Sequence, residues 1–594
     1  MGHRGPNERN GFTENNLCLH HLRLSILDIS GGAQPMHLNQ LYSIIFNGEI
    51  YNHQELRNRY GLVGKTHSDT ETLLLLYQKM GINMLNELDG MFSFCIYDKT
   101  RQQILLARDR AGEKPLYVYD DGEKFVFCSE LNCLKALLPL QKNDHAFFHY
   151  FRLGCFYRSL TPYKNVTELE GGSYMRVNLQ NMEKEQKRWW NIHSCYLQKS
   201  DLNIEDAISK TDELLHTSIK RRIDTSDLEV GCFLSGGIDS GLVTSIATQY
   251  KPQLKTFTIS FPGSYNEAPL AKLVAEKYGT IHREISLSFN HLREDIETIL
   301  SNYGEPFFDS SAVPSYYVSR EAKKHLTVIL NGDGADELFG GYRRYVPFAK
   351  YDFFNQNRMV KGLAGALSTA LPHPGNKKST YNFIYRLASL ASKSGVETYL
   401  AAGVDILEGY EKWIKNPGFD YLLPIKQDFE TITGSALNGL SKIMNMDFDC
   451  NLFSDLLVKM DIATMAHSLE GRSPFLSKEI VELAPTLPNH YKINNRKTKF
   501  LLRRLAENYL PAELIHQPKR GFEVPLKDWV NNTLNEVIQS YLSDPNAMYH
   551  PFFKKDFGAR LLSNKISMPP EKRAKVIWML FAMEVWYKRV YLQR

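Results

Sequence analysis

The chain has 594 residues, of which 43% are hydrophobic, 12% aromatic and 23% charged, as in an ordinary globular protein. This length predicts two or three domains rather than one core. The net charge of +5 is small and the basic residues form no block, which argues against a nucleic-acid-binding protein.

The eight cysteines are scattered and form no CxxC pair, so the sequence predicts neither a zinc site nor a redox motif. Several lie in apolar runs, where cysteine is usually a small buried hydrophobe. The N-terminus lacks the pattern of a signal peptide, and no apolar run approaches the ~20 residues that span a bilayer. We therefore expect a cytoplasmic protein with reduced cysteines and without membrane or nucleic-acid partners.

The first 130 residues are rich in short β-forming runs, at 41–52, 91–98 and 124–130. Between them, residues 69–81 have helical spacing and end at a glycine stop. Residues 131–200 are a transition, in which the stretch 169–178 is expected to be a β-hairpin.

After residue 203, helices alternate with short β runs within 228–240, 254–261 and 326–342. This alternation predicts a parallel sheet with helices on both faces. From residue 430 the chain is expected to be mostly helical, with a loop over 516–529. We place the two domains at 1–200 and 201–594.

The stretch Ser-Gly-Gly-Ile-Asp-Ser at 235–240 stands between a β run and a helix. Two glycines allow a tight turn, and a helix start offers unpaired N–H groups to a pyrophosphate. Ser235 and Ser240 can add hydroxyl donors, whereas Asp239 would repel phosphate unless it binds Mg²⁺. No Gly-Lys-Ser/Thr follows, so this is not a Walker A loop. A plain glycine turn is the less favoured alternative.

A second motif, at 330–345, clusters Asp333, Asp336 and Glu337 between glycines after another β run. Carboxylates this close repel one another unless they hold a metal or share a proton. A solvated acidic turn is the alternative. It is disfavoured because the cluster follows a predicted parallel strand, and α/β sheets bind ligands at the carboxyl ends of their strands.

The chain, which contains both of these motifs, resembles the glutamine-hydrolysing asparagine synthetases over nearly its whole length. The resemblance rests on motifs in the same order, at 3–6, 22–36, 46–52, 68–74, 109–117, 235–240, 331–342, 455–476 and 518–526. It implies a truncated α+β N-terminal-nucleophile glutaminase domain, an αββα sandwich. An α/β parallel-sheet synthetase domain of the adenine nucleotide alpha hydrolase-like type would follow it.

In the glutaminase half, the resemblance implies a glutamine site. Arg23 would pair with the glutamine carboxylate, for which a bidentate guanidinium is suited. Asp69 would hold the amino end, and Asn47 and Gly48 would form the oxyanion hole. Glu49 belongs to the same glutamine-binding stretch.

In the synthetase half, the resemblance implies an ATP site whose loop residues are Leu234, Ser235, Gly236, Gly237, Asp239 and Ser240. Ile259 would back the adenine. Asn331 and Gly332 would form the next nucleotide contact. Asp336, like Asp239, would bind Mg²⁺ or pyrophosphate.

The resemblance also implies a reaction centre. Lys519 would stabilise charge as an acyl-adenylate forms and reacts. Asp333 stands where these synthetases often carry glutamate. Glu470 and Arg472 would lie at a helix end near the substrate.

Members of the family begin Met-Cys-Gly-Ile, and that cysteine is the glutaminase nucleophile; this chain begins just before His3. Either the start is placed too far downstream or the protein is a natural truncation with a crippled glutaminase. We favour the first, because an open sheet edge would be unfavourable and the glutamine-binding residues remain. Cys18 is expected to be a packed strand thiol rather than a replacement nucleophile. For the chain as given we expect no glutamine hydrolysis.

The expected function is ATP-dependent adenylation of aspartate and its amidation with ammonia from glutamine, giving asparagine, AMP and pyrophosphate, with ATP and Mg²⁺ required. Amidation of a sugar acid of surface polysaccharides, closure of a β-lactam ring and an ammonia-only synthetase remain alternatives. A non-catalytic nucleotide-binding protein is a rival from another class. A homodimer is left open.

Overall fold

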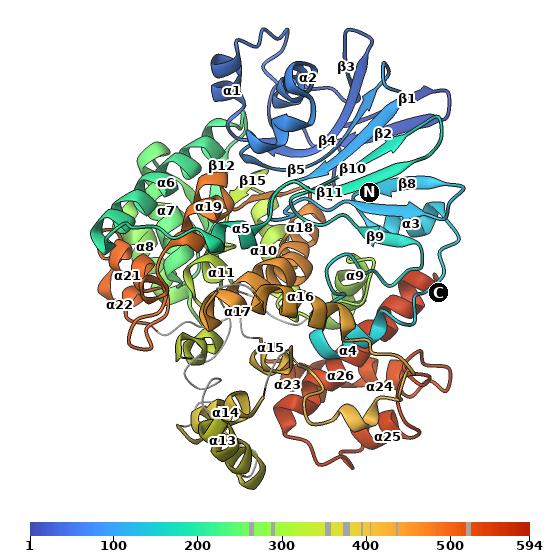
Figure 1. Cartoon of the computed structure of the whole chain (residues 1–594), viewed down its shortest axis with the longest axis vertical. Coiled ribbons are helices and arrows are strands. Elements are labelled where there is room, and N and C mark those ends of the chain that lie inside the picture. The colour runs from blue at the N-terminus through green and yellow to red at the C-terminus, as the bar shows by residue number, and fades with distance from the viewer. Residues whose placement is uncertain are drawn as a thin grey trace.

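An antiparallel sheet forms the centre of the N-terminal part of the computed structural model (Figure 1). The structure describes residues 1–260, 266–286, 291–350, 358–371, 380–393, 396–403, 405–434, 437–517 and 524–594. The order of the sheet's six strands in this part of the chain is β11-β10-β6-β5-β4-β3. Their bounds are β3 (Met36–Leu38), β4 (Tyr42–Ile50), β5 (Gly90–Asp98), β6 (Gln103–Arg108), β10 (Ser173–Asn178) and β11 (Lys184–Arg188).

The two faces of this sheet are buried by different elements, because side chains alternate along each strand. Phe92, Phe94 and Ile96 of β5 pack in one core with the leucines of helix α2 (Asp69–Met80), which lies next to α1 (His53–Tyr60). Cys95 and Tyr97 point to the other face, into a second core. That face is covered by β1 (Glu8–Glu14) and β2 (Leu17–Arg23), and by the sheet of β7 (Tyr117–Asp120), β8 (Phe125–Cys128) and β9 (Val166–Glu168).

The predicted strands and the predicted helix of this part are confirmed. Helix α2 begins after Ser68, whose hydroxyl accepts the Thr70 N–H, and ends at Gly81, as predicted. The expected hairpin at 169–178 is wrong. Only its second half is a strand, β10, which pairs with β6 and β11, because the Gly171-Gly172 turn carries the chain out of one sheet and into another.

A parallel sheet organises the second part, as predicted. In the described residues its strand order is β14-β13-β12-β15-β16, and every pairing is parallel. Both faces are buried: Val328 and Leu330 of β15 belong to one core and Ile329 to another. The strands are β12 (Val230–Phe233), β13 (Lys255–Ser260), β14 (Ile281–Ser286), β15 (Val328–Leu330) and β16 (Glu470–Arg472).

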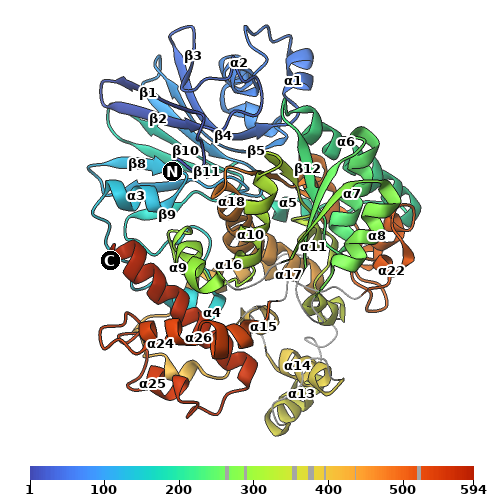
Figure 2. The same ribbon diagram turned by 180° about the vertical axis from the view of Figure 1, so that it is seen from behind.

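Helices cover both faces of the parallel sheet (Figures 1 and 2). The first core contains side chains of α6 (Ile204–Asp224), α7 (Ile238–Tyr250) and α8 (Ala268–Tyr278). The second contains side chains of α10 (Ala312–Lys323), beside which α18 (Val458–Met465) lies. The loops at the carboxyl ends of β12 and β15 therefore open at one edge of a fully covered sheet, where α/β proteins bind ligands.

The described residues after 430 are mostly helical, as expected, apart from β16. Of the expected loop at 516–529, residues 518–523 lie outside the described residues, and α23 covers Leu526–Asp528. No helix among the described residues is long and apolar enough to cross a membrane. The other α-helices are α3 (Leu131–Leu137), α4 (Phe147–Leu153), α5 (Ile192–Leu197), α9 (Leu292–Ser301), α11 (Ala335–Phe339), α13 (Arg358–Ala370), α14 (Thr380–Ser392), α15 (Val396–Ala402), α16 (Leu423–Thr433), α17 (Gly439–Asp447), α19 (Lys478–Thr486), α20 (Asn489–Lys492), α21 (Phe500–Ala506), α22 (Ala512–Ile515), α24 (Asn535–Leu542), α25 (Phe557–Leu562) and α26 (Pro570–Val585).

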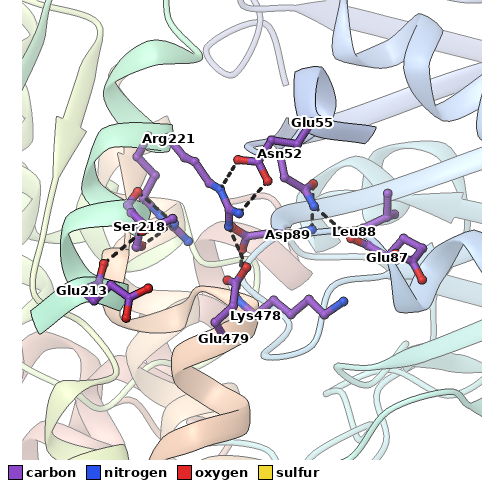
Figure 3. A network of polar contacts seen from close by, with 12 residues as sticks. Asn52, Glu55, Glu87, Leu88, Asp89, Glu213, Ser218, Arg221, Lys478 and Glu479 are labelled. Atoms are coloured by element: carbon purple, nitrogen blue, oxygen red, sulfur yellow. Dashed lines mark hydrogen bonds and ion pairs between the residues drawn. The ribbon is translucent and has the colours of Figure 1, made fainter. Parts of the chain in front are cut away.

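A partly buried ionic network joins the two parts at Arg221 of α6 (Figure 3). Its guanidinium donates to Asp89 Oδ2 at 2.9 Å, to Glu479 Oε1 at 2.8 Å and to both oxygens of Glu55 at 2.8 Å. Asp89 is 1% exposed, and its other oxygen accepts the backbone N–H of Lys478 at 3.0 Å. The Asp89 carboxylate is therefore compensated chiefly by one arginine from the other part of the chain.

Replacing Arg221 is expected to destabilise the protein strongly. Arg221→Ala leaves the buried Asp89 carboxylate without its cation, and breaking such a pair costs about 3 kcal/mol or more. The control is Arg59→Ala, whose ion pair with Glu87 has an arginine side chain that is 63% exposed, and exposed pairs contribute less than about 1 kcal/mol. Urea unfolding and limited proteolysis would measure both. Equal effects of the two substitutions would contradict the assignment.

Candidate active sites

A cavity of about 1040 Å³ lies between the layers of the N-terminal part. All five residues predicted to bind glutamine line it: Arg23, Asn47, Gly48, Glu49 and Asp69. They come from β2, β4 and the start of α2. The fold thus brings together side chains that the sequence separates by up to 46 positions, counted from Arg23 to Asp69. A cavity of this size can hold an amino acid.

Gly48 has a backbone conformation that other residues rarely adopt. Its φ is +142°, and a Cβ placed there would lie 2.0 Å from the carbonyl oxygen of Met91 on the paired strand β5. Only glycine fits this approach. Beside it, the amide of Asn47 donates to Ser129 Oγ at 3.5 Å. The two residues expected to form an oxyanion hole therefore sit on the cavity wall, on a strand whose position is fixed by its neighbour.

Arg23 is 5% exposed, and its guanidinium already has partners. Nη1 lies 2.6 Å from Glu8 Oε1 and 2.9 Å from the carbonyl oxygen of Ile29. Nη2 donates to the carbonyl oxygens of Leu27 and Asp28. A ligand carboxylate would have to take the place of Glu8, whose side chain is 30% exposed.

Glu49 and Asp69 form a buried carboxylate pair in the same cavity. Burial raises the pKa of both groups, and the neighbouring Asp69 raises the pKa of Glu49 further. Asp69 also accepts the backbone N–H groups of Ile50 and Thr70, at 2.9 and 2.8 Å, which favours its charged form. The pair therefore keeps a proton on Glu49 more readily than on Asp69.

The Glu49 carboxylate also contacts a cation from the parallel sheet, Arg472. Arg472 is fully buried, and its Nη2 donates to Glu49 Oε2 at 3.0 Å, while its Nε donates to Glu470 Oε1 at 2.9 Å. The expectation that Glu470 and Arg472 lie at a helix end is wrong. They form the edge strand β16, because their backbone pairs with β15. Glu470 lines the N-terminal cavity.

The predicted phosphate loop joins β12 to α7. The backbone N–H of Leu234 donates to Phe257 O of β13 at 2.9 Å, which fixes the start of the loop. The Ser235 and Ser240 hydroxyls lie 2.9 Å apart, and Ser240 Oγ accepts the Ser235 N–H at 3.0 Å. In this structure the two hydroxyls therefore hold the loop closed on itself. Ile259 lies on the adjacent strand β13.

The acidic motif follows β15 and packs against this loop. The Asn331 N–H donates to Arg472 O at 3.0 Å, and the Asn331 side chain accepts the Asp333 N–H at 3.2 Å. A Cβ on Gly332 would lie 2.9 Å from the Cβ of Asp239. The absence of a side chain at 332 thus allows the two predicted nucleotide loops to touch.

Lys499 joins the two loops and was not found from the sequence. Its Nζ lies 2.5 Å from Asp239 Oδ2 and 2.7 Å from Asp336 Oδ1, and the residue is 3% exposed. In the sequence it stands among basic residues at the start of an amphipathic helix, where a solvated lysine is the usual interpretation. Its burial, visible only in the structure, marks it as part of the site.

Further charged groups surround the acidic motif. Burial, reinforced by Asp336, raises the pKa of Glu337 to about 7, and the Tyr342 hydroxyl donates to its Oε1 at 2.5 Å. Burial, reinforced by Asp309, raises the pKa of Asp455 to about 8. Lys459 donates to Asp309 at 3.2 Å. Residues Phe448–Leu457 are a π-helix, a local form that is frequent at functional sites.

Two of the predicted residues need separate mention. Lys519 lies outside the described residues. Cys18 lies on β2, as expected, but the expectation that it is packed is wrong. It is exposed, and its sulfur contacts Thr13 and His20, because it sits on the outward face of the two-stranded ribbon.

The carboxylates of Asp239 and Asp336 lie close enough together that both contact Lys499 Nζ. In the described residues, no group of three or more His, Cys, Asp or Glu side chains is arranged to hold a metal ion. Two carboxylates nevertheless fit Mg²⁺, which binds one or two carboxylates and completes its coordination with water and substrate phosphates.

Comparisons with known proteins agree with this division into two sites. The family model of asparagine synthase matches residues 210–588, and that of a glutamine amidotransferase domain matches residues 1–190. The chain is 30% identical to asparagine synthetase [glutamine-hydrolyzing] 1 of Bacillus subtilis, over 98% of this chain and 92% of the relative. It is 31% identical to a putative asparagine synthetase of Mycobacterium tuberculosis, over 89% and 83%. It is 32% identical to asparagine synthetase B of Escherichia coli, over 58% and 60%.

His21, on the cavity wall, is expected to make stability depend on pH. Burial, with the Arg23 guanidinium acting in the same direction, lowers its pKa from 6.5 to about 4, and its Nε2 lies 3.0 Å from Phe46 O. Below pH 6.5 the unfolded chain binds a proton that the folded chain does not. The contribution of His21 is thus constant above this pH and falls as the pH is lowered, by at most about 1.4 kcal/mol per unit.

The test compares His21→Gln with His20→Gln, which changes the exposed neighbour on the same strand. Urea unfolding at pH 5 to 7.5 should show a shallower loss of stability below pH 6.5 for His21→Gln alone. The same slope in all three proteins would contradict the assignment.

Proposed function

The chain belongs to the asparagine synthase family, and we propose that it adenylates the side-chain carboxylate of aspartate with ATP and converts the acyl-adenylate to asparagine. An ATP-dependent ligase is what the family implies. The observation that carries the assignment of the ATP site is the meeting of Asp239, Asp336 and Lys499 where the loops after β12 and β15 touch. A pair of carboxylates with a buried ammonium suits a site for pyrophosphate and its cation.

We propose that the loop 235–240 binds the phosphates of ATP. The turn precedes α7, a helix of 13 residues whose N-cap is Gly237, and the Gly237 N–H donates to Ser235 Oγ at 3.2 Å. The Gly236 and Gly237 N–H groups and this helix N-terminus would bind the phosphates once that bond is exchanged. They offer donors and a positive dipole end to the leaving pyrophosphate. Leu234, Ile259, Asn331 and Gly332 would bind the rest of the nucleotide. Leu234 follows β12 and Asn331 follows the adjacent strand β15, so both stand at the carboxyl ends of neighbouring strands, which supports this proposal.

Asp239 and Asp336 are the residues that would hold Mg²⁺. When bound, the ion supplies charge neutralisation for the phosphates. Lys499 Nζ, which lies against both carboxylates, would move onto pyrophosphate oxygens as negative charge builds on the leaving group. Lys519 and Asp333 are proposed to act at the acyl-adenylate, Lys519 by stabilising its charge.

We propose that the N-terminal cavity binds glutamine. The proposed domain limits are 1–200 and 201–594. Asn47 and the Gly48 N–H would stabilise the oxyanion, Asp69 would bind the ammonium group, and Arg23 would bind the carboxylate after exchanging Glu8. The two stacked sheets with α1 and α2 on one side support an αββα sandwich of the N-terminal-nucleophile type.

Pyrophosphate release in the presence of Mg-ATP, aspartate and ammonium tests the function. We expect release that depends on all of them and an equal amount of asparagine. Release with a sugar acid but not with aspartate would overturn the assigned acceptor. ATP binding without release under any condition would overturn the catalytic assignment. Glutamine in place of ammonium tests the cavity separately. Release with glutamine would show that the N-terminal part supplies ammonia to the synthetase site.

Lys499→Met is expected to slow pyrophosphate release about 100-fold, because a preorganised cation at the leaving group is lost. Lys499→Arg, which keeps the charge, should retain more activity. The matched control is Lys497→Met, which changes an exposed lysine two residues away and should leave the rate unchanged. A wild-type rate in a folded Lys499→Met protein would remove Lys499 from the site.

A further inference from the structure

The helices α13 and α14 form a pair that projects from the body of the protein, at the end opposite the N-terminal sheet (Figures 1 and 2). In the part of the chain that the structure describes, α13 packs chiefly against α14. Ala364 of α13 and both Ala388 and Leu390 of α14 are buried. One side of α13 therefore faces its neighbour, and the other side faces outward.

The outward side of α13 is apolar. Met359, Leu363 and Leu367 are 79%, 64% and 49% exposed, and their spacing of four residues places them along one face of the helix. Among the α13 side chains that the structure describes, every exposed residue is apolar or glycine: Met359, Gly362, Leu363, Ala366, Leu367 and Ala370. A surface helix normally turns its polar residues outward. This reversed pattern marks a surface that binds a protein or a membrane.

The sequence of this part of the chain is strongly basic. Between Asp352 and Glu397 there are six lysines and arginines and no acidic residue. The rest of the chain has 65 basic and 66 acidic residues, so the net charge of +5 arises from this one stretch. Lys361 lies within the apolar helix itself, and Lys393, just after α14, lies 2.8 Å from Glu408. An apolar face in a basic segment fits a partner that is both apolar and anionic.

A second copy of the chain fits this surface less well than a membrane does. In a symmetric dimer the same patch lies on both subunits, so two basic segments without acidic residues would meet. Their like charges would repel one another. A bilayer of anionic lipids offers an apolar interior together with negative headgroups, and it therefore complements both properties of the surface.

We propose that α13 and α14 bind the surface of a membrane that contains anionic lipids. The exposed leucines would enter the boundary between headgroups and acyl chains, and basic residues would bind lipid phosphates. With its 13 residues, α13 is about 20 Å long, which suits a helix that lies in the plane of the membrane. The expectation of no membrane partner rested on the lack of a long apolar run. That lack excludes a spanning helix but not one that lies on the surface.

Sedimentation of the full chain with sucrose-loaded vesicles tests the proposal. The vesicles contain phosphatidylcholine alone or an equal mixture of phosphatidylcholine and phosphatidylserine. We expect the wild type to bind the mixed vesicles about tenfold more tightly than the neutral ones. Leu363→Ser combined with Leu367→Ser should weaken this binding about tenfold, because apolar burial is lost. Lys361→Gln should weaken it about fivefold, the effect of one basic residue near an anionic surface.

The matched control combines Leu197→Ser with Leu423→Ser. These leucines are 51% and 48% exposed but belong to α5 and α16, so binding should stay unchanged. Circular dichroism would establish that the variants fold. The proposal would be overturned by no binding to the mixed vesicles, by equal affinity for both kinds of vesicle, or by equal losses in the control and in the α13 double variant.

Light scattering without vesicles tests the second copy as the partner. A dimer that the double substitution at Leu363 and Leu367 abolishes would assign the face to another chain and overturn the proposal. A mass that is the same in the wild type and in this variant is the expected result. None of these readouts depends on the ligase activity.

Discussion

One buried arginine, Arg472, holds the two halves of the protein in register. Its guanidinium binds Glu49 of the N-terminal cavity and Glu470 of its own strand. It also donates to the carbonyl oxygen of Arg222 at 2.7 Å and to Thr225 Oγ1 at 3.0 Å, at the end of α6. Because a fully buried guanidinium is stable only when its donors are satisfied, the sheet, the helix and the cavity must keep these positions together.

This arginine also connects the two candidate sites through the backbone. Its carbonyl oxygen accepts the Asn331 N–H, at the start of the acidic motif, while its side chain reaches the carboxylate next to Gly48. A shift of β16 would therefore alter both sites at once. Other buried ionic contacts cross the same interface, among them Arg221 with Asp89, Arg4 and Lys114 with Asp461, and Arg152 with Asp405. Ion pairs of this kind fix position and angle more strictly than apolar contact does.

The sequence was sufficient for the elements whose pattern is local. The β runs, helix α2 and the alternation that builds the parallel sheet all follow from spacing and stop signals, and the structure has them. It failed where a residue's role depends on distant partners. The Gly171-Gly172 turn was taken for the centre of a hairpin, because nothing local tells a turn between two sheets from a turn within one. Strand β16 has three residues and exists only because β15 lies beside it.

In the candidate site, too, residues in a local pattern could be found from the sequence, and residues defined by distant partners could not. The sequence singled out the glycines and carboxylates of the two loops that the structure brings together, because their close spacing has few structural explanations. Lys499 could not, because a lysine gains its role here from two aspartates that are 260 and 163 positions away in the chain. The arrangement of Glu49 with Asp69 and Arg472 likewise appears only when three elements meet.

The charge balance of the acidic motif explains why Lys499 belongs there. Asp239 and Asp336 approach one point from separate loops, and without a cation their repulsion would push those loops apart. Lys499 supplies one positive charge, and burial raises the pKa of Glu337 to about 7, so that this carboxyl is partly protonated at neutral pH. The two loops can therefore stay in contact before any ligand arrives. In the proposed function, a phosphate ligand would meet a preformed site, and the free energy of its binding would not be spent on assembling the loops.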